Sequence, residues 1–304
     1  MVNQKIDGIS FPIKEPHDFS FLSRFGRVFC VFATNDSGNI SFGVSDGTNK
    51  YFIKVAGAKT ARACVSTQQA VQNLKAAIPL YMDLSHPHLI QLQESFDDGD
   101  LCVAVFKWAE GECLFDHWNF EMYEKSNILP PRKQFKKLSS EKKLKAFDAV
   151  FDFLAFAESK DYVAIDFYDG SILYDFERDI VTICDIDLFR KKPVVNEMGE
   201  DFWGTNRLKS PEEYLLGAEI DSITNVFTLG ALLFHYFGEY TDAEMDRMYE
   251  NHAFFPCRYE AWELNRPLYE VARKAVCPDR TNRFASIHAF YTAWNEKLSK
   301  DLTD

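Results

Sequence analysis

Short apolar runs separated by polar turns dominate the first part of the chain. RVFCVFA, ISFGV and YFIKVA follow one another between residues 27 and 56, with the turn sequences NDSGN and SDGTN between them. Runs of this length bounded by Asn, Asp, Ser and Gly are typical of antiparallel strands. Two more strand-like runs, HLIQLQESF and LCVAVFKWA, follow a polar stretch of helical composition that we expect to end near Pro79. This part is therefore predicted to be a sheet with one inserted helix.

The rest of the chain has a mainly helical pattern. In SSEKKLKAFDAVFDFLAFAESK, the apolar residues Leu144, Phe147 and Phe151 recur at spacings of three and four, so they share one face of a helix. A short strand pair, SILYD and DIVTICDID, comes next, and NVFTLGALLFHYF has the all-apolar pattern of a buried helix. The sequence thus predicts an α+β fold with two lobes, a small antiparallel-sheet lobe at 1–107 and a larger helical lobe at 108–304.

Length, charge and cysteine usage narrow the class of protein. A chain of 304 residues is long enough for two lobes with a buried core. A formal net charge of −12 repels polyanions, so we expect no nucleic-acid partner. The seven cysteines are scattered without a CxxC pair, as in reducing compartments, and no apolar stretch is long enough to span a bilayer. We therefore predict a cytoplasmic protein without a membrane partner.

Lys54 is unusual because it lies inside the apolar strand sequence YFIKV. An ammonium group in such surroundings is costly unless an anion meets it, so we expect a negative group nearby. The alternative is an edge-strand lysine whose side chain reaches water.

Acidic residues gather around the predicted short strand pair. The period of two along a strand would place Asp185 and Asp187 on the same face of VTICDID. Two carboxylates there repel each other unless a divalent cation lies between them. Asp166 and Asp169 enter the preceding strand, and an acid there would face the same metal site. The alternatives are solvated carboxylates at a strand end and an ordinary Asp-Gly turn.

Several motifs follow one another in a specific order. A strand lysine, a helix, the linker VFKWAEGECL, a long helix, VAIDFYDGSIL, ICDID, GTNRLKSPEE, NVFTLGALL and CPDRTNRF occur in turn. This order resembles the eukaryotic-type protein kinase superfamily, in a divergent form similar to bacterial serine/threonine kinases. The resemblance implies a bilobal kinase-like fold and transfer of a phosphoryl group from ATP, with Mg (or Mn), to a hydroxyl group of a protein or small molecule.

The resemblance also implies roles for single residues. Lys54 would hold the nucleotide phosphates, and Asp166 would orient the acceptor hydroxyl as the catalytic base. Asp185 would be the magnesium aspartate. Thr205 matches the threonine that steadies the catalytic aspartate.

The nucleotide's base and phosphates have their own implied positions. The linker that contains Phe106, Lys107 and Trp108 would contact adenine. Gly38 lies near the tip of the hairpin that covers the phosphates in the family. Glu212 and Arg283 would form a buried ion pair that anchors the activation segment, here residues 185–212.

The catalytic loop, residues 164–171, departs from the family pattern. Ala164-Ile165-Asp166 stands for His-Arg-Asp, Tyr168 for the loop's lysine and Ser171 for its metal-binding asparagine. Without the arginine, no receptor for an activation-loop phosphate is evident. Asp187 replaces a glycine, as in small-molecule kinases, where the second acid helps to hold metal. The implied metal ligands are therefore Asp185, Asp187, Ser171 and Asp169.

Other departures favour a second interpretation. No Asp or Glu occurs from Val55 through Met82, so the inserted helix lacks the glutamate that pairs with the strand lysine in the family. NDSGNISFG lacks the three-glycine spacing, and Asn225 replaces the aspartate that supports the catalytic loop. The alternative function is thus a pseudokinase that binds nucleotide or acts as a scaffold without turnover.

Overall fold

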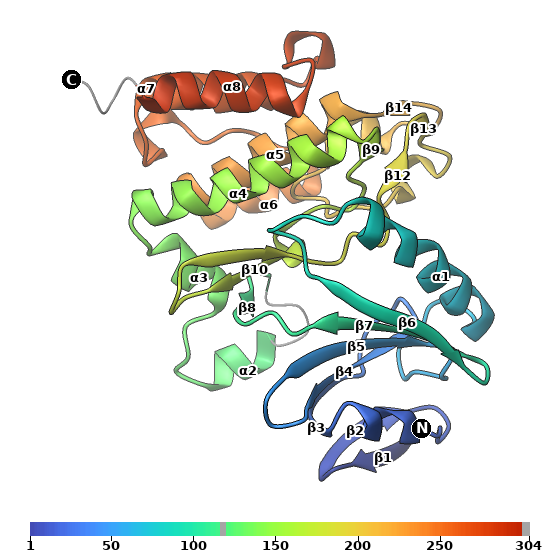
Figure 1. Cartoon of the computed structure of the whole chain (residues 1–304). Coiled ribbons are helices and arrows are strands. Elements are labelled where there is room, and N and C mark those ends of the chain that lie inside the picture. Colours follow the sequence, from blue (N-terminus) through green and yellow to red (C-terminus); the bar gives the residue numbers. More distant parts are fainter. Residues whose placement is uncertain (116–119, 300–304) are drawn as a thin grey trace. The chain divides into compact units, whose positions relative to one another are not determined.

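The chain folds into two compact units, Met1–Glu110 and Gly111–Asp304. The computed structural model describes residues 1–115 and 120–299. A five-stranded antiparallel sheet in the first unit is followed by a largely helical second unit (Figure 1). The predicted α+β class is therefore confirmed.

The sheet of the first unit has the strand order β3-β4-β5-β7-β6. Strands β4 and β7 are buried along almost their whole length, because α1 contacts β5, β6 and β7 (Figure 1) while N-terminal residues form a core with the apolar side chains of the sheet. The five predicted strands are confirmed. Their bounds are β3 Arg27–Phe32, β4 Asn39–Ser45, β5 Lys50–Ala56, β6 Leu92–Asp98 and β7 Leu101–Lys107.

An N-terminal hairpin adds to this sheet's core and was not predicted from the sequence. The rings of Phe11 and Phe19 lie 5.9 Å and 5.0 Å from that of Phe42 on β4, so the first residues of the chain are part of the folded unit. The added elements are β1 Val2–Ile6, β2 Ile9–Ile13 and the 3-10 helix η1 Ser20–Arg24.

Helix α1, Thr67–Asp83, ends later in the sequence than predicted. It begins after Ser66, whose side chain accepts a hydrogen bond from the Gln69 amide. The expected end near Pro79 is wrong, because the helix continues through this proline. Leu80 and Tyr81 beyond it are buried, and their packing offsets the single hydrogen bond that a proline removes.

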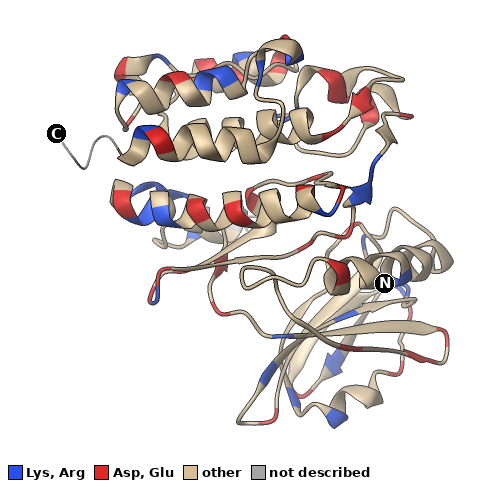
Figure 2. Ribbon diagram, turned by 45° about the horizontal axis from the view of Figure 1, so that its top comes forward, with Lys and Arg blue, Asp and Glu red and all other residues tan. Residues whose placement is uncertain are grey.

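The second unit is built around helix α5, Ser222–Phe237, which contacts α4, α7 and α8. The prediction that this helix is buried is confirmed, since nearly all its residues are inaccessible. Acidic and basic residues are interspersed over other elements of both units (Figure 2). The remaining helices are α2 Phe120–Lys125, α3 Pro131–Lys136, α4 Ser140–Ser159, α6 Asp242–Glu250, α7 Arg266–Ala275 and α8 Ile287–Leu298.

Short antiparallel strands and 3-10 turns carry the motif residues of the second unit. Strand β10 lies between β8 and β11, β9 pairs with β12, and β13 pairs with β14. The described residues include no helix that is both long and apolar enough to cross a membrane. The strands are β8 Glu112–Cys113, β9 Tyr162–Val163, β10 Ile172–Asp175, β11 Ile180–Ile183, β12 Arg190–Lys191, β13 Val194–Val195 and β14 Glu219–Ile220. The 3-10 helices are η3 Asp169–Ser171, η4 Gly199–Asp201, η5 Pro211–Tyr214, η6 Tyr259–Ala261 and η7 Arg280–Asn282.

Candidate active site

Helix α5 is hydrogen-bonded to the backbone at the start of the catalytic loop. The side-chain amide of Asn225 donates a hydrogen bond to the Ala164 carbonyl and accepts one from the Ala164 N–H, both at 2.8 Å. An asparagine side chain can do both because it carries a donor and an acceptor. Asp166 follows with a left-handed backbone, φ 57°, a conformation that Asp tolerates better than most residues. Asn225 therefore supports the loop that presents Asp166.

Asp166 and Thr205 line the same small pocket of the second unit. Lys209 and Glu213 line this pocket as well. The backbone explains why Thr205 and Lys209 lie together, since the amides of Leu208 and Lys209 both donate to the Thr205 carbonyl, at 2.9 Å and 3.2 Å. This tight turn brings Lys209 back beside Thr205. Sequence reasoning missed Lys209 and Glu213, although the charged residues on both sides of Ser210-Pro211 were an available signal.

Asp169 is fully buried, and both of its carboxylate oxygens have partners. One oxygen forms an ion pair with Arg207 of the activation segment. The other accepts a hydrogen bond from the Tyr236 hydroxyl at 3.2 Å. The ring of His235 lies close by, and burial together with the charge of Arg207 holds its pKa well below the usual value. A metal ion at Asp169 would have to displace Arg207.

The β10–β11 hairpin brings together two parts of the chain that carry predicted metal ligands, Ser171 before β10 and Asp185 after β11. The Cys184 amide donates to the Ser171 carbonyl at 2.9 Å, so Ser171 lies beside the residue that precedes Asp185. The Ser171 hydroxyl is buried, and no hydrogen-bond partner for it is found among the described residues.

The expectation that Asp185 and Asp187 share one strand face is wrong. Strand β11 ends at Ile183, and Asp185 has a left-handed backbone with φ 54°. Asp187 lies in the turn that follows. Since the period of two holds only along an extended strand, it does not set the relative orientation of these two acids.

The charges of Asp166 and Asp185, the predicted base and magnesium ligand, both affect the Tyr168 hydroxyl. Burial, followed by the charges of Asp166 and Asp185, raises the pKa of its hydroxyl well above the usual value. Its ring contacts that of Phe115 at 5.6 Å. Asp166 and Asp185 therefore lie in one region of the second unit, around a neutral phenol.

Lys54 and Phe106 lie on the same face of the sheet in the first unit. Lys54 is 8% exposed and is paired in register with Ser41 and Ala104 on the flanking strands. The edge-strand alternative is wrong, because β5 lies between β4 and β7. Phe106 is buried with its ring 4.8 Å from that of Tyr81 on α1.

The loop before β4 packs against the beginning of α1. Gly38 has φ 81°, and a Cβ atom there would lie 3.0 Å from the Cβ of Ala70. Phe106 and Lys107 of the predicted linker are the last two residues of β7. Lys107 is exposed, and the Trp108 amide just after the strand donates to the Lys50 carbonyl at 3.0 Å. The Trp108 ring lies 4.9 Å from that of Phe29.

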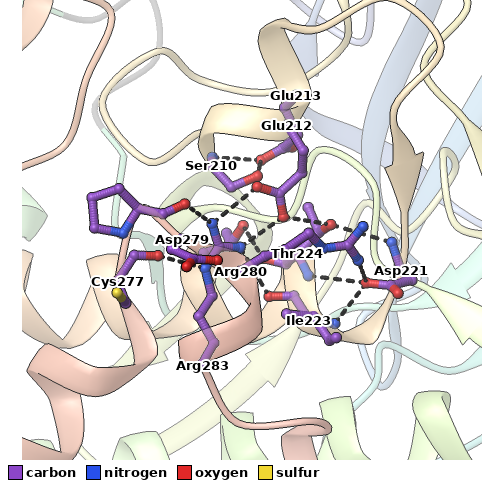
Figure 3. Close-up of polar contacts among 12 residues, drawn as sticks. Ser210, Glu212, Glu213, Asp221, Ile223, Thr224, Cys277, Asp279, Arg280 and Arg283 are labelled. Carbon is purple, nitrogen blue, oxygen red and sulfur yellow. Dashed lines mark hydrogen bonds and ion pairs between the residues drawn. The ribbon is translucent and has the colours of Figure 1, made fainter.

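Glu212 and Arg283 form the ion pair that the sequence predicts (Figure 3). Two hydrogen bonds of 2.7 Å and 3.0 Å join the guanidinium group to the two carboxylate oxygens. The Thr224 hydroxyl donates to the same carboxylate at 3.0 Å, and Arg283 also donates to the carbonyls of Cys277 and Pro278. Burial raises the pKa of Glu212, but the hydrogen bonds and charge of Arg283 outweigh burial and lower it overall.

Glu213, the next residue, has a different environment. Its carboxylate accepts hydrogen bonds from the amide and hydroxyl of Ser210, at 2.7 Å and 2.9 Å. Burial nevertheless raises its pKa to about 7. The pKa values of these adjacent glutamates are thus shifted in opposite directions, because Glu212 has a bidentate arginine partner and Glu213 does not.

In the described part of the chain, no three His, Cys, Asp or Glu side chains are grouped so that they could hold a metal ion. The implied ligands therefore do not form a closed protein cage. Magnesium in nucleotide sites commonly uses only one or two carboxylates and completes its shell with phosphate oxygens and water.

Comparison with known proteins finds a distant and partial similarity to a protein kinase. No protein-family model matches the chain. Calcium-dependent protein kinase 5 of Plasmodium berghei (strain Anka) is 26% identical over 169 residues, which are 54% of this chain and 26% of that protein. The chain thus covers only a minor part of this relative's length. The similarity agrees in direction with the motif order and gives weak support for a protein-kinase-like superfamily.

Replacing Glu212 by Ala should lower the free energy of unfolding by about 3–5 kcal/mol, because it leaves Arg283 as a buried charge without its carboxylate. Urea denaturation at neutral pH measures this loss. The double variant Glu212→Ala, Arg283→Met is the control and should recover part of the stability. An unchanged unfolding midpoint in the single variant would show that the ion pair does not contribute.

Replacing Glu213 by Gln should stabilise the protein at pH 8 and have little effect at pH 5. A carboxyl group whose pKa is about 7 in the folded state and 4.5 ordinarily binds its proton more tightly when folded. Stability from this group is therefore present at low pH and declines as pH rises through this window, by about 3 kcal/mol at most. Glutamine mimics the protonated form, so thermal unfolding across this pH range measures the effect. An equal gain at both pH values would contradict it.

Proposed function

We propose that the chain is a divergent, ATP- and magnesium-dependent phosphotransferase with a protein-kinase-like bilobal fold. The observation that carries the proposal is the shared pocket of Asp166 and Thr205. A loop clamped by Asn225 supplies the first residue, and a segment anchored by Glu212 supplies the second. The kinase-like motif order and the partial similarity to a protein kinase favour this reaction over others that use a single carboxylate.

In the proposed reaction, Asp166 accepts the proton of the acceptor hydroxyl as it attacks the terminal phosphorus of ATP. Thr205 borders the same pocket and steadies this carboxylate. Lys54 holds the nucleotide's phosphates, and the end of β7 with Phe106 and Lys107, together with Trp108 after it, contacts adenine. Gly38 belongs to the loop over the phosphates.

Magnesium would be held by Asp185, with Asp187 and the Ser171 hydroxyl as further ligands. These oxygen donors suit a magnesium site that phosphate oxygens complete, and the buried Ser171 hydroxyl without a described partner agrees with a missing ligand. Bound magnesium neutralises charge on the phosphates. We assign Asp169 to the ion pair with Arg207 instead of to the metal.

A second candidate is a pseudokinase. Within α1, the only acidic residue is Asp83 at its end, so the helix has no acid in its interior to pair with Lys54. The loop at Gly38 also packs against α1, where Ala70 lies. Both features concern residues proposed to bind nucleotide, whereas the Asp166 pocket concerns phosphoryl transfer. Separate measurements of nucleotide binding and of transfer therefore distinguish the pseudokinase from the phosphotransferase.

Phosphoryl transfer from labelled ATP, with magnesium or manganese, should be detectable as autophosphorylation or with pools of proteins and metabolites. Asp166→Asn should lower the transfer rate by about 10²–10⁴-fold, the usual contribution of a general base, while nucleotide binding persists. Nucleotide binding without transfer in the unaltered chain would favour the pseudokinase. Neither binding nor transfer would contradict both functions.

Asp185→Asn should abolish magnesium-dependent nucleotide binding, because the anchoring negative charge is lost. Asp187→Gly should weaken magnesium affinity without unfolding the protein, since glycine is tolerated in a turn but brings no oxygen ligand. Titrating magnesium against nucleotide affinity compares the two variants. Unaltered metal dependence in Asp187→Gly would remove Asp187 from the site.

A further inference from the structure

Lys209 is a buried cation in the pocket of the proposed catalytic base. The residue is only 4% exposed and lines the pocket together with Asp166 and Thr205. Its ammonium group donates a hydrogen bond to the Glu200 carbonyl at 3.3 Å and lies 5.1 Å from the centre of the Tyr214 ring. Burying an ammonium group is costly, so its position in this pocket calls for a reason.

The backbone around Lys209 is built to admit its side chain. Gly204 has φ 119°, and a Cβ atom there would lie 3.3 Å from Cε and 3.4 Å from Cγ of Lys209. Any other residue at 204 would therefore press on the lysine stem. The turn that Thr205 closes with the amides of residues 208 and 209 fixes the other end of that stem.

The charges of nearby acids do not fully offset the cost of burying the Lys209 ammonium group. Burial is the main cause that lowers the pKa of Lys209, against the opposing charges of Glu213, Asp166 and Asp201. Glu213 already accepts two hydrogen bonds from Ser210. An ammonium group has three donors, and the bond to the Glu200 carbonyl uses one of them.

The catalytic loop itself offers a neutral side chain where the kinase resemblance expects a lysine. Tyr168 occupies that position, and burial and the neighbouring acids keep its phenol protonated. A transferred phosphoryl group carries negative charge on its oxygens and needs positive donors aimed at it. Lys209 reaches the same pocket from the activation segment.

We propose that Lys209 is a further catalytic residue, which donates a hydrogen bond to the transferred phosphoryl group and stabilises its charge in the transition state. This inference rests on the proposed phosphotransferase function. The acceptor oxygen forms a bond to the terminal phosphorus while the bond to the bridging oxygen breaks and its electron pair leaves with ADP. The hydroxyl proton goes to Asp166, and Lys209 stays protonated throughout.

The test compares Lys209→Met and Lys209→Arg in the full chain with a matched control, Lys191→Met. Lys191 is also a lysine over a tyrosine ring, 5.2 Å from that of Tyr162, but it is exposed. Three quantities are measured: the transfer rate, the affinity for magnesium-ADP alone, and the gain in that affinity when aluminium fluoride mimics the phosphoryl group in flight.

Lys209→Met should lower the transfer rate by about 10²–10³-fold, the usual cost of removing one transition-state donor. It should also lose the aluminium fluoride gain while ADP affinity and melting temperature stay close to those of the unaltered chain. Lys209→Arg should restore part of both, and Lys191→Met should change neither.

Unaltered transfer and an unaltered aluminium fluoride gain in Lys209→Met would overturn the inference, and Asp166→Asn would still report on the proposed function. A joint loss of ADP affinity, melting temperature and transfer would also overturn it, because the lysine would then be structural. If the unaltered chain binds nucleotide but shows neither transfer nor the aluminium fluoride gain, the proposed function fails and this inference fails with it.

Discussion

The buried ion pair of Glu212 and Arg283 is the contact on which the arrangement of the second unit depends. It joins residues far apart in the sequence, since Glu212 ends the activation segment and Arg283 follows η7 near the last helix. The guanidinium group also binds backbone carbonyls before η7, and the carboxylate accepts from Thr224 on α5 (Figure 3). A single buried charged pair thus joins three parts of the chain.

This anchoring has consequences for the adjacent pocket. Glu212 pairs with Arg283, and the next residue, Glu213, closes the turn at Ser210 through two hydrogen bonds. Lys209 directly precedes that turn, and its amide donates a hydrogen bond to the Thr205 carbonyl. Both Lys209 and Thr205 line the pocket of Asp166. The polar groups of the pocket are therefore positioned by the backbone that the ion pair fixes.

Local patterns predicted the five strands of the first unit's large sheet and the buried helix α5, but they predicted neither the N-terminal hairpin β1–β2 nor the long-range contacts. Burial of α5 on all sides follows from its largely apolar sequence, and the strands follow from short runs between turn residues. Helix α1 passes Pro79 because the residues after it pack against other parts of the unit, which a local rule does not include. In the same way, the backbone at Asp185 is left-handed and lies beyond the end of β11, so the period of a strand does not apply to it.

The candidate site shows the same division. The motif order was enough to select Asp166, Thr205 and the ion pair, because those positions have a fixed place in the sequence of motifs. The partner of Asp169 was not predictable, since Arg207 becomes its neighbour only after the activation segment folds back onto the catalytic loop. Lys209 was missed for the same reason.

The catalytic loop and the activation segment are joined by contacts that the unmodified chain already makes. Ile165 stands where the kinase resemblance expects an arginine, and it packs in an apolar cluster with Phe202 of the activation segment. The ion pair of Arg207 with Asp169 adds a charged link in which the segment supplies the cation and the loop the anion. An arginine at 165 would need a negative partner on the segment, and a phosphate would provide one. With an isoleucine there, burial of apolar surface provides the link instead, so the proposed enzyme has its loop and segment joined without a phosphate.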